Sequence, residues 1–176
     1  MNFLDVRNAV ISGLEQHVGC PIVLSEQISE RPPFPYGYYS VLAPRISNHA
    51  FGLQYVKEAA NEILLKRDEP VSATMSFTFC SQNRETDEGY IYGEDEAVKL
   101  AEKAHGFFLL NSRCIATKDG DIVIDSVGSV ANRSSFIVEE TVRRYGFDVK
   151  FNYIRTDEMP TTTIKNAGNP KGNPHV

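Results

Sequence analysis

The sequence contains no tryptophan, only three cysteines and no long apolar run. The cysteines, Cys20, Cys80 and Cys114, lack C-x-x-C spacing, which favours reduced, packed thiols over a disulfide framework or a zinc site. Such thiols are typical of a protein that folds in a reducing cytosol. No window approaches the roughly 18 apolar residues of a membrane-spanning helix. The first residues lack the apolar segment of a signal peptide, so we expect neither a leader nor a membrane partner.

A basic excess is also missing. The chain has 176 residues, with 18 Lys and Arg against 23 Asp and Glu, and its net charge is −5. A protein that clamps nucleic acid needs a basic surface to neutralise phosphates, so this balance argues against such a clamp. The length predicts one domain, because a chain of this size buries enough surface to fold without disulfides or a metal.

The usual signatures of catalysis are absent too. The sequence has no glycine-rich phosphate loop and no G-x-S-x-G nucleophile turn. The histidines are His17, His49, His105 and His175. None of them is spaced from another as a metal-ligating pair would be. We therefore expect no catalytic residues, no bound metal and no cofactor.

One acidic group leaves an enzymatic alternative open. In a strand, Asp121 and Asp125 would share one face while Ile122 and Ile124 occupy the other. Two carboxylates on one face could hold a metal ion for a small metal-dependent hydrolase. A turn at Asp119 followed by a solvated strand edge explains the same residues more simply, and we favour that interpretation.

Two segments have the apolar spacing of amphipathic helices. The first spans residues 3–17 and is expected to end at Gly19, since Pro21 forbids its continuation. The second spans residues 94–111 and begins with acidic side chains, which a helix N-terminus favours. The expected buried stripe of the second helix is Ala97, Ala101, Ala104 and Phe108.

Several shorter segments have the apolar pattern of strands. They are residues 22–24, 38–42, 62–67, 71–80, 114–116, 122–124 and 147–153. We expect Pro44 to close the second of these. Residues 51–56 would suit a strand and residues 59–62 a helix, but we favour an extended loop over 45–60 that leads into the strand at 62–67. A turn at residues 68–70 would join 62–67 to 71–80 as a hairpin, and residues 81–89 would form a polar loop. Short connections suit antiparallel pairing, so the predicted class is α+β, an antiparallel sheet with helices packed on one face.

The composition changes near the C-terminus. Residues 157–176 are rich in Thr, Gly, Asn and Pro and contain few apolar residues. Such a segment cannot bury enough surface to order itself. We therefore predict a single domain over residues 1–156, followed by a flexible C-terminal arm over 157–176 that is disordered or becomes ordered on a neighbour.

The most unusual stretch is residues 132–149, which places Glu139-Glu140 and Arg143-Arg144 before the final strand. One interpretation is a turn with solvated ion pairs, each worth about 0–1 kcal/mol. The other is a charged contact surface between subunits, where arginine is common. The residues alone favour neither.

A family resemblance lies in the same stretch. It rests on Val130-Ala131-Asn132-Arg133, Glu139-Glu140 and Arg144-Tyr145-Gly146-Phe147-Asp148-Val149. These segments, above all the last, resemble the neck or tail terminator proteins of tailed bacteriophages. The aromatic segment 36–41, the strand ending at Ser76-Phe77 and the helix over 96–108 are similar as well. The resemblance implies a tail-terminator-like α+β fold and a virion structural protein without catalytic residues.

The resemblance further implies a homo-oligomeric ring, expected to be a hexamer, in the neck of the virion. Such a ring caps the tail tube protein and joins it to the head-completion or connector protein, after assembly in the host cytoplasm. DNA would pass through the lumen without specific binding, which an acidic ring permits. A head-completion or head–tail adaptor is the alternative structural role. The hypothetical assembly contacts are Arg133, Arg143, Arg144, Tyr145, Asp148, Tyr90 and Tyr92.

Overall fold

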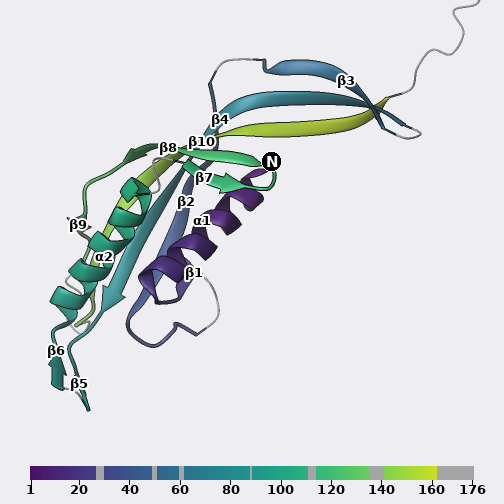
Figure 1. Ribbon diagram of the computed structural model, residues 1–176. Helices are drawn as coiled ribbons and strands as arrows, with labels where there is room; N and C mark the ends of the chain where they lie inside the picture. The colour runs from purple at the N-terminus through teal and green to yellow at the C-terminus, as the bar shows by residue number, and fades with distance from the viewer. Residues whose placement is uncertain are drawn as a thin grey trace, which may run out of the picture.

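The computed structural model describes residues 1–26, 30–48, 51–59, 62–87, 89–110, 114–134 and 141–161. Two helices and ten strands lie within this part of the chain (Figure 1). The helices are α1 (Phe3–Val18) and α2 (Gly93–Leu110). The strands are β1 (Ile22–Leu24), β2 (Tyr36–Ser47), β3 (Leu53–Ala59), β4 (Glu62–Ser81), β5 (Arg84–Thr86), β6 (Gly89–Ile91), β7 (Cys114–Thr117), β8 (Gly120–Val127), β9 (Ala131–Asn132) and β10 (Arg143–Thr161).

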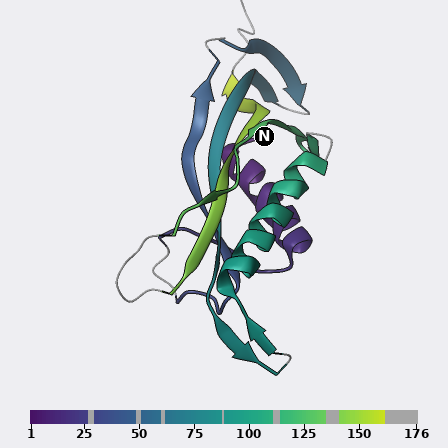
Figure 2. The same cartoon turned by 90° about the vertical axis from the view of Figure 1, so that its left-hand side faces the viewer.

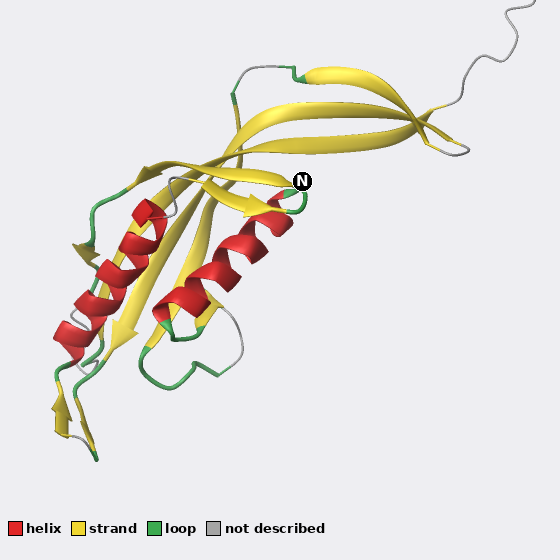
Figure 3. Ribbon diagram, viewed as in Figure 1, coloured by secondary structure: helices red, strands yellow, loops and turns green. Residues whose placement is uncertain are grey.

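The long antiparallel pair of β4 and β10 organises the sheet (Figure 3). The two strands pair without interruption from Arg143 opposite Ser81 to Thr161 opposite Ile63. The larger sheet has the order β1-β2-β4-β10-β8-β7, with β3 paired to β4 and β9 paired to β10. Its pairings are antiparallel except for β1 with β2, while β5 and β6 form a separate hairpin. The sheet is thus mostly antiparallel and accompanied by two helices, as the short connections predicted.

One apolar cluster joins the sheet to both helices. Every second residue of β4 from Val71 to Phe79, and of β10 from Phe147 to Tyr153, is buried in it. The ring of Phe108 from α2 lies against three rings of the sheet, with centroid distances of 5.3 Å to Phe77 and 5.9 Å to Phe147 and Phe151. Burying a side chain of this size contributes about 1.5–3 kcal/mol.

Both predicted helices form, and their ends have clear causes. Asn2 caps α1 by accepting a hydrogen bond from the Asp5 backbone N–H, and the Asp5 carboxylate accepts one from Asn2 in return. Gly19 ends α1 in the left-handed conformation at φ 83°, where glycine has no Cβ penalty. The stripe predicted for α2 is buried, together with Phe107. Asn111, the last residue expected in α2, lies outside the described residues.

The predicted turn at residues 68–70 is wrong, because β4 continues straight through it. Pro70 is tolerated there for a positional reason. Strand β2 pairs with β4 only from Val71 onward, and β3 pairs with β4 only up to Asp68. Pro70 therefore lies opposite the gap between these two strands, where its missing N–H costs no ladder hydrogen bond on that side. The real hairpin partner of residues 62–68 is β3.

Two further expectations about this region are also wrong. Pro44 does not close its strand, since β2 runs to Ser47 with register shifts between Val41 and Ala43 and between Ala43 and Ile46. Such bulges accommodate a proline without ending the strand. Residues 53–59, expected within an extended loop, form β3 instead. Residues 51–56 were compatible with a strand, but no local signal separated a strand from an extended loop.

The remaining connections follow the predictions more closely. The β7–β8 hairpin turns at Asp119 and Gly120 as expected. The loop expected over residues 81–89 contains the short β5–β6 hairpin. Strand β10 is longer than predicted and includes residues 157–161, so the expected boundary at residue 156 falls within a strand. Residues 162–176, most of the predicted C-terminal arm, lie outside the described residues, and the division into domain and arm stays a prediction.

The molecule has two extensions at opposite ends of its helix-packed body (Figures 1 and 2). We call the first the outer sheet; it consists of β3, residues 62–69 of β4 and residues 154–161 of β10. We call the second the tyrosine hairpin; it consists of residues 84–92. The rest of the described chain is the body.

Candidate assembly surfaces

Five of the predicted contact residues gather on or beside β10 in the body. Arg143, Arg144, Tyr145 and Asp148 belong to the strand itself. Arg133 follows β9, which pairs with β10 through Asn132 opposite Tyr145. The structure thus brings these five residues into one neighbourhood. The sheet ladder explains the grouping, because β9 lies directly along the first residues of β10.

Arg133 binds within its own subunit. Its guanidinium donates hydrogen bonds to Ser76 Oγ at 2.6 Å, Thr78 Oγ1 at 3.0 Å and Asp148 Oδ1 at 2.8 Å. Burial alone would raise the pKa of Asp148, but hydrogen bonds from Ser76 and Arg133 outweigh it and hold that pKa below its ordinary value. Arg133 therefore fastens the segment after β9 to the polar face of the sheet.

Glycine at position 146 is required by the same close packing. A Cβ there would lie 2.2 Å from the Phe77 carbonyl oxygen and 2.8 Å from Thr78 Oγ1. No real Cβ approaches a backbone oxygen so closely, so any side chain would push β10 away from β4. The Tyr-Gly-Phe part of the family phrase therefore has a structural explanation.

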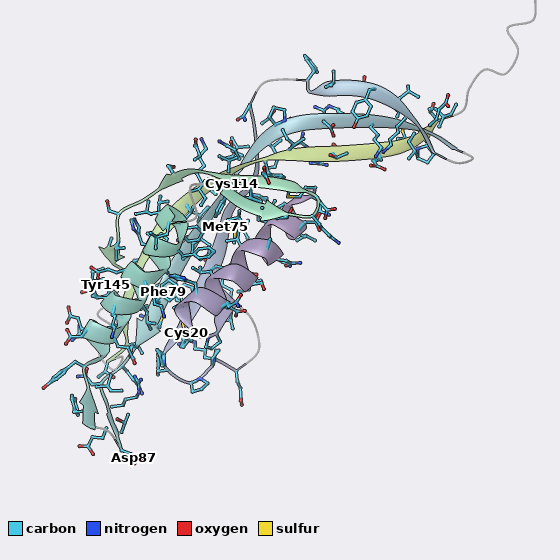
Figure 4. The ribbon with its side chains drawn as sticks, viewed as in Figure 1. Cys20, Met75, Phe79, Asp87, Cys114 and Tyr145 are labelled. Carbon is cyan, nitrogen blue, oxygen red and sulfur yellow. The ribbon has the colours of Figure 1, made fainter. Side chains whose placement is uncertain are left out.

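Tyr145 links β10 to the first turn of α2 (Figure 4). Its hydroxyl donates to Glu94 Oε1 at 2.8 Å and accepts from Asn132 Nδ2 at 3.3 Å. The bond to Glu94 raises the pKa of Tyr145, because ionisation would place two negative charges side by side. Tyr145 thus has a positioning role within the subunit.

Arg143 and Arg144 lie where β10 begins, and both side chains are half-buried. Arg144 contacts the thiol of Cys80, which is also beside Tyr36. Burial raises the pKa of the Cys80 thiol to about 11, and Arg144 only partly opposes this. The buried thiol of Cys20 has a pKa raised to about 11 for the same reason. Both thiols are therefore protonated and unreactive at neutral pH, in agreement with the free state of all three cysteines.

The other two predicted residues, Tyr90 and Tyr92, project from the tyrosine hairpin. Their side chains are 51% and 62% exposed, and their rings meet edge to face with centroids 5.0 Å apart. Asp87 marks the tip of the same hairpin (Figure 4). Aromatic side chains held in the open in this way are common anchors of protein–protein interfaces.

A rigid anchor holds the tyrosine hairpin to α2. Arg84 donates two hydrogen bonds to the Glu96 carboxylate, at 2.7 and 2.8 Å, and Ser81 donates another. These bonds, that of Arg84 foremost, hold the pKa of Glu96 below its usual value. Asn83 caps the helix by accepting from the Gly93 N–H at 2.8 Å. The base of the hairpin is thus tied to α2 by side-chain hydrogen bonds.

The two carboxylates of the enzymatic alternative belong to β8. Asp121 and Asp125 lie on the exposed face of β8, as alternation predicted. Asp125 forms an ion pair with Lys150 at 3.0 Å. In the described part of the chain, no group of three or more His, Cys, Asp or Glu side chains is arranged to hold a metal ion. His17 and His105 stack against Phe107 and Phe147, whereas His49 and His175 lie outside the described residues.

Sequence reasoning missed the outer sheet as a surface. Leu53, Val56 and Met159 are 69%, 60% and 58% exposed on it. Its base is fixed by Glu69, whose 1% exposed side chain accepts a hydrogen bond from Arg45 at 2.5 Å and forms an ion pair with Arg67 at 3.0 Å. The apolar residues of segment 51–56 and the apolar run of 63–65 were the signals that could have revealed a third strand beside β4 and β10.

Comparison with known proteins places this arrangement in a family. A family model described as phage neck terminator protein matches residues 8–174, nearly the whole chain. A search of curated proteins finds no match. No helix in the described residues is long and apolar enough to cross a membrane. The family match confirms the resemblance carried by the β9–β10 phrase and gives the protein a structural role in the phage neck and tail. The chain belongs to the phage neck terminator protein family.

Proposed function

We propose that this chain forms a ring, a hexamer by expectation, that caps the tail tube and joins it to the head connector in the virion neck. The observation that carries the proposal is the family match over residues 8–174. Assembly takes place in the host cytoplasm, with the tail tube protein and a head-completion or connector protein as neighbours. The protein acts by shape and contact, without catalysis.

The two extensions support this role. A subunit in a closed head-to-tail ring needs two different surfaces that complement each other, and a neck protein needs further surfaces for the components above and below it. The tyrosine hairpin offers exposed, rigid aromatic anchors at one end of the body, beside the half-buried Arg143 and Arg144. In this proposal both helices pack on one face of the sheet.

The charge of the chain supports a lumen through which DNA slides. Each subunit has a net charge of −5, so a ring of subunits has the same sign of charge as the DNA phosphates. The release of counterions from DNA therefore does not drive tight binding to the ring. DNA then passes during ejection without being held.

Particle phenotype tests the proposal. A phage lacking this gene product should accumulate full heads and overlong or unjoined tails, visible by electron microscopy. The supply of the intact chain from a plasmid is the control and should restore joined particles. DNA-leaking heads beside tails of normal length would instead assign the head-completion adaptor role. Normal infectious particles without the chain would refute both roles.

A charge reversal at the start of β10 tests the contact surface. We expect Arg144→Glu to disrupt assembly more than folding, with ring or particle assembly reduced at least tenfold, even though loss of its contact with the Cys80 thiol also lowers the thermal midpoint. Arg133→Glu is the matched comparison, since the ion pair of Arg133 with Asp148 and its bond to Ser76 lie within the subunit and its reversal should lower stability more than assembly. Equal losses of stability and assembly in Arg144→Glu would contradict an interface role for this residue.

A further inference from the structure

The outer sheet has two edges that no described strand covers. Strand β3 pairs only with β4, so the opposite side of its seven residues is open among the described residues. Strand β10 pairs with β9 and β8 only up to Asn152, so residues 153–161 have no strand on that side within the described chain. Long uncovered edges present unpaired backbone groups, and natural proteins shield them or use them for pairing.

The two edges are complementary in direction. Because β3 and β10 are each antiparallel to β4, they are parallel to each other. If copies of the chain stand side by side around an axis along the strands, β3 of one copy runs parallel to β10 of the next. Each addition leaves the same two edges free at the ends, so the pairing repeats until rotation closes the ring.

The direction of the backbone groups on each edge follows from bonds within the subunit, one of which already uses the Thr156 N–H. On β10, the Asp148 carbonyl accepts from Gly128 at 2.7 Å and the Thr156 N–H donates to the Met1 carbonyl at 3.4 Å, both away from β4. Even-numbered residues of β10 therefore point their backbone groups outward. The unbroken registers through β4 carry this alternation to β3, where Val56 points its N–H and C=O outward.

An apolar row crosses the outer sheet and ends at both edges. Val56, Leu65 and Met159 lie opposite one another on the three strands and share one face. Val56 and Met159, at the two open edges, are 60% and 58% exposed. Side-by-side copies would continue this row from subunit to subunit and bury both exposed ends.

We propose that the open edge of β3 in one copy pairs in parallel with the open edge of β10 in a neighbouring copy, so that the outer sheets join into one continuous ring of strands. This rests on the ring role proposed above and specifies which surfaces close it. The occupant of each edge is a second copy of this chain, because the chain itself carries both edges, in one direction and with matching faces.

Two registers of β3 beside the neighbouring β10 place side chains of the same sheet face next to each other. They differ by two residues, because a shift of two residues leaves each side chain on its own face. In one, Val56 lies beside Met159 and the apolar row is continuous. In the other, Val56 lies beside Asp157 and Lys57 lies beside Glu158, which pairs opposite charges across the joint. Pro160 has no N–H and therefore ends the series of donors at the outer end of β10.

Disulfide cross-linking tests the pairing. We would make two double variants, Val56→Cys/Met159→Cys and Val56→Cys/Asp157→Cys. Each variant is oxidised after its oligomer has been isolated by size exclusion, or in phage particles that contain it. Within one chain these positions flank β4, two strand spacings or roughly 10 Å apart, beyond the roughly 7 Å limit for a disulfide. A bond between them therefore joins two chains. We expect one of the two variants to give a ladder of covalent multimers on non-reducing gels.

The controls separate this inference from the ring itself. Each single cysteine variant, and Val56→Cys/Glu158→Cys with its cysteines on opposite faces, should give no ladder. An oligomer or particle that contains the chain but yields no ladder from either test pair would overturn the edge pairing and leave the ring role standing. A chain absent from every oligomer and particle would refute the proposed function together with the pairing.

A proline substitution provides an independent test. Because the Val56 N–H points away from β4, Val56→Pro removes an outward donor and leaves the β3–β4 ladder its hydrogen bonds. We expect oligomer formation to fall at least tenfold, with the circular dichroism spectrum and thermal midpoint close to wild type. Lys57→Pro is the matched control that breaks the inner ladder, and it should unfold the outer sheet. Unchanged oligomerisation of a folded Val56→Pro protein would contradict the pairing.

Discussion

The same two strands behave differently in the body and in the outer sheet. In the body, the alternate apolar residues of β4 and β10 lie under the helices, and Phe77, Met75 and Phe147 are 0% exposed. In the outer sheet the ladder continues in perfect register, yet Val56 and Met159 are mostly exposed. Hydrogen-bond pairing alone therefore does not make a core. We infer that the packing of the helices against the sheet supplies most of the folding stability, and that the uncovered part of the sheet is available for contact.

Polar contacts support the outer sheet in place of a core. Glu69 at its base is almost fully buried between Arg45 and Arg67. Asp68 accepts hydrogen bonds from Tyr55 at 3.0 Å and Thr156 at 2.7 Å. Such bonds contribute about 1 kcal/mol each, well below the burial of a large apolar side chain, so they orient a sheet more than they stabilise a fold.

The largest expected effect contrasts an apolar residue of the body with one of the outer sheet. Phe147→Ala should lower the free energy of unfolding by about 3–5 kcal/mol, because it leaves a cavity among Phe77, Phe108 and His105. Met159→Ala should change it by less than about 1 kcal/mol, since its side chain is 58% exposed. Urea unfolding of both variants measures the difference. Similar losses would mean that the isolated outer sheet is as well packed as the body.

An intermediate effect is expected at the junction. Glu69→Ala leaves Arg45 and Arg67 without their shared carboxylate, and we expect a cost of about 1–3 kcal/mol. The loss should be local, with faster amide hydrogen exchange in β3 and residues 62–69 and unchanged exchange in α2. Glu158→Ala, which removes only the exposed partner of Lys66, is the control and should alter exchange little. Uniformly faster exchange would show that the outer sheet and body unfold together.

The smallest effect concerns pH and belongs to the body. The pKa of Glu96 is held low by Arg84 and Ser81 in the folded state. Its contribution is therefore complete above its unfolded value of about 4.3 and is lost as the pH falls through the lower folded value. The stability advantage of wild type over Glu96→Gln should be full near neutral pH and shrink in acid, measured by urea unfolding between about pH 3 and 7. An advantage that grows as the pH falls would contradict the assignment.

The predicted contact residues include exposed side chains and side chains bonded within the subunit. The family resemblance indicated Tyr90 and Tyr92, which are exposed on an anchored hairpin. It also located Arg133 and Tyr145, whose polar groups bond within the subunit to the sheet and to α2. A sequence gives the charge and aromaticity of a residue but not the partner that satisfies it. Their role as assembly contacts stays a prediction that the variants above test.

The sequence by itself determined both helices and their ends, the alternating faces of β4 and β10, and the β7–β8 turn. These features depend on local periodicity, capping and turn chemistry, which neighbouring residues carry. It also carried the family resemblance that the match over residues 8–174 confirms. The tertiary structure was needed to show that β4 passes through Pro70, that residues 53–59 become a strand, and that residues 154–161 of the longest ladder are left uncovered. Those outcomes depend on which strands lie opposite each position, and long-range pairing leaves no signal within a short window of sequence.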